Sequence, residues 1–146
     1  IIGEPQTDDD VASISETKTL AEKLGIMSLI DFEPFSDKVH SLVINDAMYV
    51  NSSDYEGMSN AMLEAMAIGL PCVCTDCPAG GARAVIKDGE NGLLTPVGDS
   101  HALYLAMKKV AENPEFANQL SANSVLIKEN QSVKKITEEW MGLING

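Results

Sequence analysis

Two glutamates separated by eight positions have the residue type and the spacing to do chemistry in this chain. They lie in the stretch YEGMSNAMLEAMAIGLP, where Glu56 precedes an expected helix and Glu64 lies inside it. From Ala61 to Ile68, Glu64 is the only residue with a polar side chain. A helix that is apolar all round is normally buried. A buried carboxylate is costly unless it is paired or hydrogen-bonded. We therefore expect Glu64 to be buried and to have a polar partner.

The residues between the two glutamates are suited to binding phosphate. A strand, the loop Ser52–Gly57 and a helix that begins at Ser59 and Asn60 would present unpaired backbone N–H groups to an anion. Glu64 would lie roughly 6 Å further along the axis, at about 1.5 Å per residue. The two carboxylates could then flank the phosphate and accept hydrogen bonds from sugar hydroxyls. The pattern points to a ligand with phosphate in the middle and a sugar at each end, which describes a nucleotide-sugar.

Composition and charge limit the classes of partner. With 45% hydrophobic and 22% charged residues, the chain reads as one globular domain over residues 1–146. No stretch approaches the apolar length of a membrane span. The net charge of −12 argues against nucleic acid, because phosphate neutralisation needs clustered Lys and Arg. A small anion held by backbone amides stays compatible with that charge.

Three cysteines lie close together in the sequence. Cys72, Cys74 and Cys77 could suggest a metal site, but no fourth ligand is nearby, and His40 and His101 are isolated. The alternation of Cys72 and Cys74 with an apolar residue is typical of a strand, so we expect small buried thiols and no metal. An odd number of free thiols fits a reducing cytosol. We expect a cytoplasmic protein.

Short apolar runs alternate with helical patterns along the chain. The expected strands are a strand end at Ile1–Gly3, then Ile26–Phe32, Ala47–Asn51, Cys72–Thr75 and Leu93–Thr95. The expected helices are Ile14–Leu24 closed by Gly25, Ser36–Asn45, Ser59–Ile68, a short one near Arg83–Ile86, one from Asp99 or Ser100 to Glu112, one beginning at Pro114, and Ser132–Ile144. Such alternation predicts an α/β fold with a mostly parallel sheet. Ligands bind beyond the carboxyl ends of the strands in such sheets. The loops that should therefore matter are Gly3–Asp10, which contains the polar loop Glu4–Asp10, and Phe32–Ser36, Ser52–Asn60 and Asp76–Gly81.

The block SSDYEGMSNAMLEAMAIGLPCVCTDCPAGGARAVIKDGENGLLTPVGD resembles a known family. It is similar to the C-terminal half of retaining glycosyltransferases of the two-domain GT-B fold, family 4, also called glycosyl transferases group 1. The hallmark of that family is Glu-x7-Glu, matched here by Glu56 and Glu64. The resemblance implies a Rossmann-like parallel sheet with helices on both faces.

The resemblance also implies roles for single residues. Glu56 would be the catalytic residue that contacts hydroxyls of the transferred sugar, and Glu64 would hold the ribose hydroxyls. The other expected donor-binding residues are Gly57, Met58, Ser59 and Asn60, along the diphosphate through backbone amides, and Leu63 beside the ribose. Gly3 and Arg83 are further candidates, although the turn Gly3-Glu4-Pro5 lacks the second glycine of the family pattern.

Two parts of the family pattern are expected upstream of Ile1: a basic Arg and Lys pair that binds the diphosphate, and the N-terminal acceptor domain. We therefore expect a fragment that transfers no sugar alone. The full enzyme would move a hexose from a UDP- or GDP-sugar to a glycan or glycolipid acceptor with retention, in cell-surface polysaccharide or glycolipid synthesis. It would need no metal or other cofactor. Peripheral association with the inner face of the membrane is a further expectation for the full-length protein.

Alternatives to these interpretations stay open at the level of sequence. The chain could be a non-catalytic nucleotide- or sugar-binding module, or part of a GT-B sugar-nucleotide epimerase. Asp8–Asp10 matches the Asp-x-Asp metal clamp of another glycosyltransferase fold, but we interpret it as a solvated charge run. Arg83, the only arginine, could meet a phosphate or an acidic acceptor, or form a surface ion pair.

Overall fold

The structure is a computed structural model that describes residues 1–5 and 7–145. Gln6, within the expected loop Glu4–Asp10, and Gly146, the end of the expected domain, lie outside the described residues. The chain divides into two compact units, Ile1–Val39 and His40–Gly146, and each is described by itself.

The first unit is built on one long helix, α1 (Asp8–Leu24). It begins six positions before the expected Ile14, because Thr7 and Asp10 form a capping box at its start. The expected polar loop is therefore wrong in its second half, since Asp8–Asp10 form the first turn of α1, where the helix dipole favours negative charge. Gly25 ends the helix in the left-handed conformation, as expected.

The expected strand Ile26–Phe32 is wrong. Met27–Leu29 form a 3-10 turn, η1, directly after the left-handed Gly25. Strand-like pairing occurs only beyond it, where Glu33 forms an isolated parallel bridge with Ile2. A short apolar run does not by itself distinguish a strand from a helical turn, and here the end of α1 starts a turn at once.

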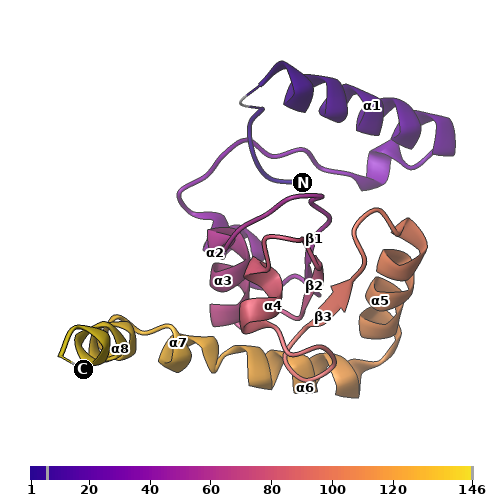
Figure 1. The fold of residues 1–146 in the computed structure, drawn as a ribbon. Coiled ribbons are helices and arrows are strands. Elements are labelled where there is room, and N and C mark those ends of the chain that lie inside the picture. Colours follow the sequence, from indigo (N-terminus) through magenta and orange to yellow (C-terminus); the bar gives the residue numbers. More distant parts are fainter. Residues whose placement is uncertain (6, 146) are drawn as a thin grey trace. The chain divides into compact units, whose positions relative to one another are not determined.

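The second unit contains a three-stranded parallel sheet, in agreement with the sequence (Figure 1). Its strands are β1 (Tyr49–Asn51), β2 (Cys72–Thr75) and β3 (Leu93–Thr95), in the order β1-β2-β3. In the register, Val50 lies beside Val73, and Val73 lies beside Leu93. All three strands therefore end at the same edge of the sheet.

Helices cover both faces of this sheet, as predicted. The helices of the unit are α2 (Val39–Val43, which begins one residue before it), α3 (Asn60–Ala67), α4 (Gly81–Val85), α5 (Ser100–Glu112), α6 (Pro114–Ser124), α7 (Ile127–Asn130) and α8 (Val133–Asn145). The helix α2 is shorter than the expected Ser36–Asn45, because Ser36 accepts from the backbone N–H of Lys38 in a turn that precedes the helix. The short α7 was not expected.

The side chains of β2 alternate between two apolar clusters, one on each face. Cys72 and Cys74 pack with Met62 and Met66 of α3, whereas Val73 packs with residues of α5 and α6. Cys72, Cys74 and Cys77 are all free and buried, which confirms the expectation of small buried thiols.

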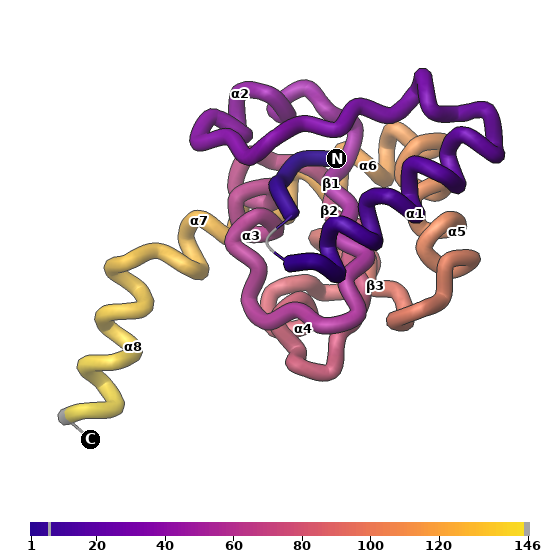
Figure 2. The backbone as a smooth tube through the Cα atoms, turned by 90° about the horizontal axis from the view of Figure 1, so that it is seen from above, coloured from indigo at the N-terminus to yellow at the C-terminus, as the bar shows by residue number. Residues whose placement is uncertain are grey.

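The C-terminal helix α8 follows α7 at the end of the chain (Figure 2). Its apolar side chains, among them Val133, Trp140 and Leu143, are largely exposed. Among the described residues, no helix combines the length and apolar character needed to cross a membrane.

Candidate functional site

The loop between β1 and α3 carries most of the residues that the sequence singled out. Ser59 is the N-cap of α3, and its hydroxyl accepts from the backbone N–H of Met62. Within the described part of the chain, no hydrogen-bond acceptor faces the backbone N–H groups of Gly57, Met58, Ser59 or Asn60. A run of unpaired N–H groups at a helix start is a site for an anion.

Glu56 lies directly before this run of N–H groups. Its side chain is half-buried and lines a small hollow together with Ser59, Thr75 and Cys77. No donor is hydrogen-bonded to its carboxylate among the residues described. Glu56 therefore presents acceptor oxygens beside the unpaired N–H groups, and carboxylate oxygens of this kind can accept hydrogen bonds from hydroxyls.

Glu64 is not buried, which corrects the expectation from the sequence. Its side chain is 47% exposed, and its Oε2 atom lies 3.5 Å from Nε2 of His40. The helix α3 buries Met62, Ala65 and Met66, but its other sides are open enough to leave Glu64 in water. The apolar run suggested burial all round, but Ala61, three positions before Glu64 on the same side of the helix, is itself exposed. The partner of this carboxylate within the described residues is His40, a pairing that was not predicted from the sequence.

Leu63 is half-buried and packs against the core cluster on the α3 side of the sheet. The structure thus brings together Glu56, Leu63, Glu64 and the four residues Gly57–Asn60 on one loop and helix. Gly3 belongs to the other unit, where its N–H donates to the carbonyl of Glu33 at 2.9 Å.

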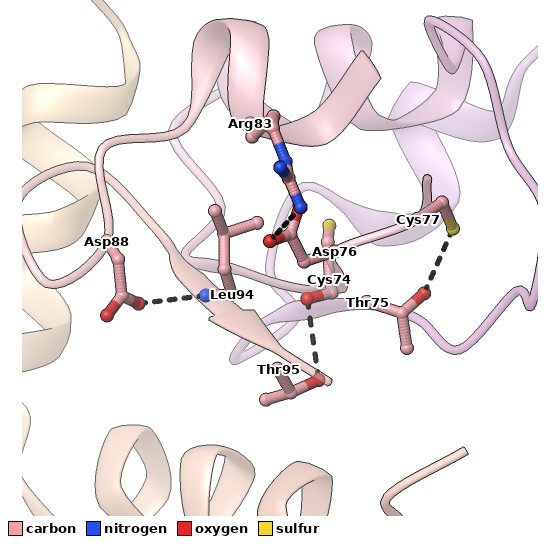
Figure 3. Close-up of polar contacts among 8 residues, drawn as sticks. All are labelled: Cys74, Thr75, Asp76, Cys77, Arg83, Asp88, Leu94 and Thr95. Atoms are coloured by element: carbon pink, nitrogen blue, oxygen red, sulfur yellow. Dashed lines mark hydrogen bonds and ion pairs between the residues drawn. The ribbon is translucent and has the colours of Figure 1, made fainter. Parts of the chain in front are cut away.

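The segment that follows β2 holds the loop in place. The hydroxyl of Thr75 and the thiol of Cys77 both donate to the carbonyl oxygen of Ser53, the thiol at 3.1 Å. Figure 3 shows these two side chains next to each other. The distance between Oγ1 of Thr75 and Sγ of Cys77 is 3.6 Å. They fix the start of the loop that carries Glu56.

Gly81 fixes the other end of the same loop. A Cβ atom at this position would overlap the carbonyl group of Gly57 and would lie 2.7 Å from the backbone nitrogen of Met58. Only glycine lets α4 begin this close to the loop.

Arg83 forms an ion pair and does not face the unpaired N–H groups as a free cation. Its Nε and Nη2 atoms donate to the two carboxylate oxygens of Asp76, both at 2.6 Å (Figure 3). The hydrogen bonds to Asp76 raise the pKa of Arg83 above its usual range. Arg83 could have been a ligand-binding residue or part of a surface ion pair, and the structure shows the ion pair.

A small polar network at the end of β1 was not predicted from the sequence. The amide of Asn51 donates to the Tyr49 hydroxyl at 3.4 Å and accepts from the backbone N–H of Ser53 at 2.9 Å. Burial raises the pKa of Tyr49 above its usual value. The sequence feature that could have identified Thr75, Cys77 and Gly81 is their position at or after the carboxyl end of β2. No comparable feature of the sequence identifies Tyr49, Asn51 or His40.

Across residues 1–5 and 7–145, no three or more His, Cys, Asp or Glu side chains are placed to hold a metal ion together. The arrangement at the start of α3 can bind an anion through backbone N–H groups and a polyhydroxylated group through carboxylates.

Residues 1–125 match the family model of glycosyl transferases group 1. An uncharacterized glycosyltransferase of Haemophilus influenzae is 32% identical over 127 residues, which make up 87% of this chain and 36% of that protein. The lipopolysaccharide core biosynthesis glycosyltransferase LpsE of Rhizobium meliloti is 28% identical over 102 residues, or 70% of this chain and 29% of that protein. The chain spans about a third of the length of these relatives.

The fold is also found in solved structures. Anabaena HepE in complex with UDP superimposes with a TM-score of 0.87 at 21% identity, over 99% of this chain and 39% of that one. The same protein in complex with UDP-glucose gives a TM-score of 0.83 at 22% identity. The likeness shows that this chain has the fold of the C-terminal half of a GT-B glycosyltransferase.

Proposed function

The chain belongs to the family of glycosyl transferases group 1, and we propose that it binds the nucleotide-sugar donor of such an enzyme at the start of α3. The observation that carries this proposal is the run of unpaired backbone N–H groups from Gly57 to Asn60 beside the unpaired carboxylate of Glu56. These N–H groups would hold the diphosphate, for which the amino end of a helix is suited.

The two carboxylates have different roles in this proposal. Glu56 contacts hydroxyls of the transferred sugar and is the catalytic residue of this chain. Glu64 accepts hydrogen bonds from the ribose hydroxyls, and Leu63 lines the pocket beside them. A structural neighbour, HepE, has been solved with UDP and with UDP-glucose, which supports a sugar linked to a nucleoside diphosphate as the ligand class.

Because the chain spans about a third of its relatives, the reaction of the whole enzyme is also part of the proposal. The donor would be a UDP- or GDP-hexose, and the sugar would pass to the hydroxyl of a glycan or glycolipid with retention. We place this chemistry in the cytoplasm, at the inner face of the membrane. The backbone N–H groups at the start of α3 would stabilise the charge that develops on the leaving diphosphate. We propose that no metal is needed.

The test assays the longest form of the protein against a panel of UDP- and GDP-sugars, with the fate of the sugar and the nucleotide followed separately. Transfer to an acceptor with release of nucleoside diphosphate supports the proposal. Donor binding without turnover would show a binding module, and an isomerised sugar-nucleotide without acceptor would show an epimerase.

The variant Glu56→Gln tests in the same assay whether the carboxylate of Glu56 takes part in sugar transfer. It keeps the size of the side chain but removes its charge, so transfer should fall by about a hundredfold or more, as when one stabilising contact to a transition state is lost. Nucleotide affinity should change little, because Glu56 faces the sugar. The matched control is Glu90→Gln, in an exposed turn away from the α3 start. Equal activity of the two variants would contradict the role of Glu56.

A further inference from the structure

The carboxylate of Glu64 has a partner that comes from a different helix. Nε2 of His40 in α2 lies 3.5 Å from Oε2 of Glu64, and the two side chains are 49% and 47% exposed. Among the described residues, His40 is the only side chain that pairs with this carboxylate. The contact therefore orients a residue that the proposed function places against the ribose.

The position of His40 is fixed by packing. Val43 lies three residues after His40 in α2, so the two side chains share one face of the helix. Val43 packs against the apolar cluster that contains Met62 and Met66 of α3. The face of α2 that carries His40 is thus held against the cluster to which the helix with Glu64 contributes.

We propose that His40 is a positioning residue for nucleotide binding, acting through Glu64; this inference rests on the proposed function. An unrestrained glutamate samples several rotamers, and ordering it when a ligand binds lowers the affinity. The imidazole of His40, whose Nε2 lies 3.5 Å from Oε2, would favour one rotamer of Glu64 in advance. A carboxylate has about four lone-pair sites, so the vicinal hydroxyls of a ribose can still be accepted by the remaining ones.

Because Nε2 of His40 makes the contact with Glu64, a substitution that keeps a nitrogen at this position should preserve nucleotide affinity. The carboxamide nitrogen of glutamine lies at about the same distance from the backbone as Nε2 of histidine, whereas that of asparagine corresponds to Nδ1. His40→Gln should therefore keep the donor to Glu64, and His40→Asn should lose it. A role for His40 that is merely structural would not separate these two variants, since both are small, polar and half-exposed.

The test measures the affinities of UDP and GDP by calorimetry for the wild-type protein and for His40→Ala, His40→Gln, His40→Asn, Glu64→Ala and the double variant His40→Ala/Glu64→Ala. His40→Ala and His40→Asn should lower the affinity for whichever of UDP and GDP binds more tightly by about 3- to 10-fold. This is within the range of coupling energies between contacting residues. His40→Gln should stay within about twofold of wild type. The double variant should bind as Glu64→Ala does. The control His101→Ala, on α5, should change nothing.

The outcomes separate this inference from the proposed function. If Glu64→Ala weakens binding but His40→Ala leaves it unchanged or tightens it, the positioning role is wrong and the proposed nucleotide site stands. Independent effects of the two alanines in the double variant would also overturn the positioning role. If the wild-type protein binds neither nucleotide, or Glu64→Ala has no effect, the ribose contact itself is wrong and the inference fails with it. Melting temperatures recorded for each variant show that the compared proteins are folded.

Discussion

At the scale of single residues, Glu56 and Glu64 present their carboxylates in different surroundings. Glu56 is half-buried at the hollow before α3 and has no partner among the described residues, whereas Glu64 is open to water and paired with His40. A ligand would therefore supply the first polar partner of Glu56. At Glu64 it would bind a carboxylate that already contacts His40. Substitutions of the two residues should affect sugar transfer and nucleotide binding differently.

Glu64→Gln should lower nucleotide affinity with little effect on stability. Hydrogen bonds to a charged group are worth about 1.5–3 kcal/mol, so the loss should be roughly ten- to a hundredfold. An exposed ion pair contributes about 0–1 kcal/mol, so the melting temperature should shift by at most about 2–4 °C. The control is Glu138→Gln, another glutamate in an exposed ion pair. A lower melting temperature with unchanged nucleotide affinity would make Glu64 a structural residue only.

Cys72 and Cys74 should be inert towards alkylation in the folded protein. Burial raises the pKa of Cys74 to about 12 and the pKa of Cys72 above its usual range, and the thiolate is the reactive species. Iodoacetamide at about pH 8.5, followed by mass spectrometry, should label these two residues only after denaturation. Labelling of Cys72 and Cys74 in the native protein at the rate of the unfolded chain would contradict the structure.

The same two thiols should make the fold sensitive to alkali. In the unfolded chain a thiol ionises near its ordinary pKa of about 8.5, whereas the folded protein keeps the proton of Cys74 up to about pH 12. The unfolded state thus loses protons that the folded state retains. The contribution of these thiols to stability is present below about pH 8.5 and is lost progressively as the pH rises through the folded-state pKa. Urea denaturation at about pH 7.5 and at about pH 10 measures this loss against the Cys72→Ala variant, in which it should be smaller.

At the scale of elements, the loop between β1 and α3 depends on the segment after β2. Gly81→Ala would place a methyl group on the backbone of Gly57 and Met58, so the loop or α4 must move. Overpacking of this kind typically costs about 1–3 kcal/mol. We expect a loss of stability in this range, together with a loss of nucleotide affinity of about tenfold or more, because the displaced groups are those proposed to hold the diphosphate.

The control for this prediction is Gly142→Ala in α8, where an added Cβ meets no atom within 4 Å. That variant should bind nucleotide as the wild-type protein does and should be at least as stable, since alanine favours a helix over glycine. If Gly81→Ala binds nucleotide normally, the close approach of α4 does not position the loop.

The elements also show what the sequence could and could not reveal. The strands β2 and β3 and the start of a helix near Ser59 and Asn60 were predicted, because buried apolar runs and helix starts are local patterns. The strand at Ile26–Phe32 was wrong, since the turn after Gly25 competes with pairing that depends on a distant partner. The exposure of Glu64 and its pairing with His40 depend on how α2 packs against α3, which no local pattern encodes.

At the scale of the whole molecule, backbone N–H groups are the proposed partners of the diphosphate. We therefore predict that a chelator leaves sugar transfer by the longest form of the protein largely intact, because a helix start can hold the diphosphate without a cation. Activity measured before and after EDTA treatment tests this. Loss of transfer with EDTA and its recovery with manganese would contradict metal independence and would return Asp8–Asp10 to consideration as a clamp.

A titration of the isotopically labelled chain with UDP and with GDP tests whether the start of α3 binds the diphosphate. The NMR signals of the backbone amides report the binding at each residue. If the diphosphate binds at the start of α3, the amides of Gly57, Met58, Ser59 and Asn60 should shift in a saturable way with at least one of the two nucleotides. The amides of Phe116 and Ala117 in α6, whose side chains pack in the cluster on the other face of the sheet from Met62 of α3, should stay in place. Saturable shifts that omit Gly57–Asn60, or no shifts with either nucleotide at millimolar concentration, would contradict the proposed site.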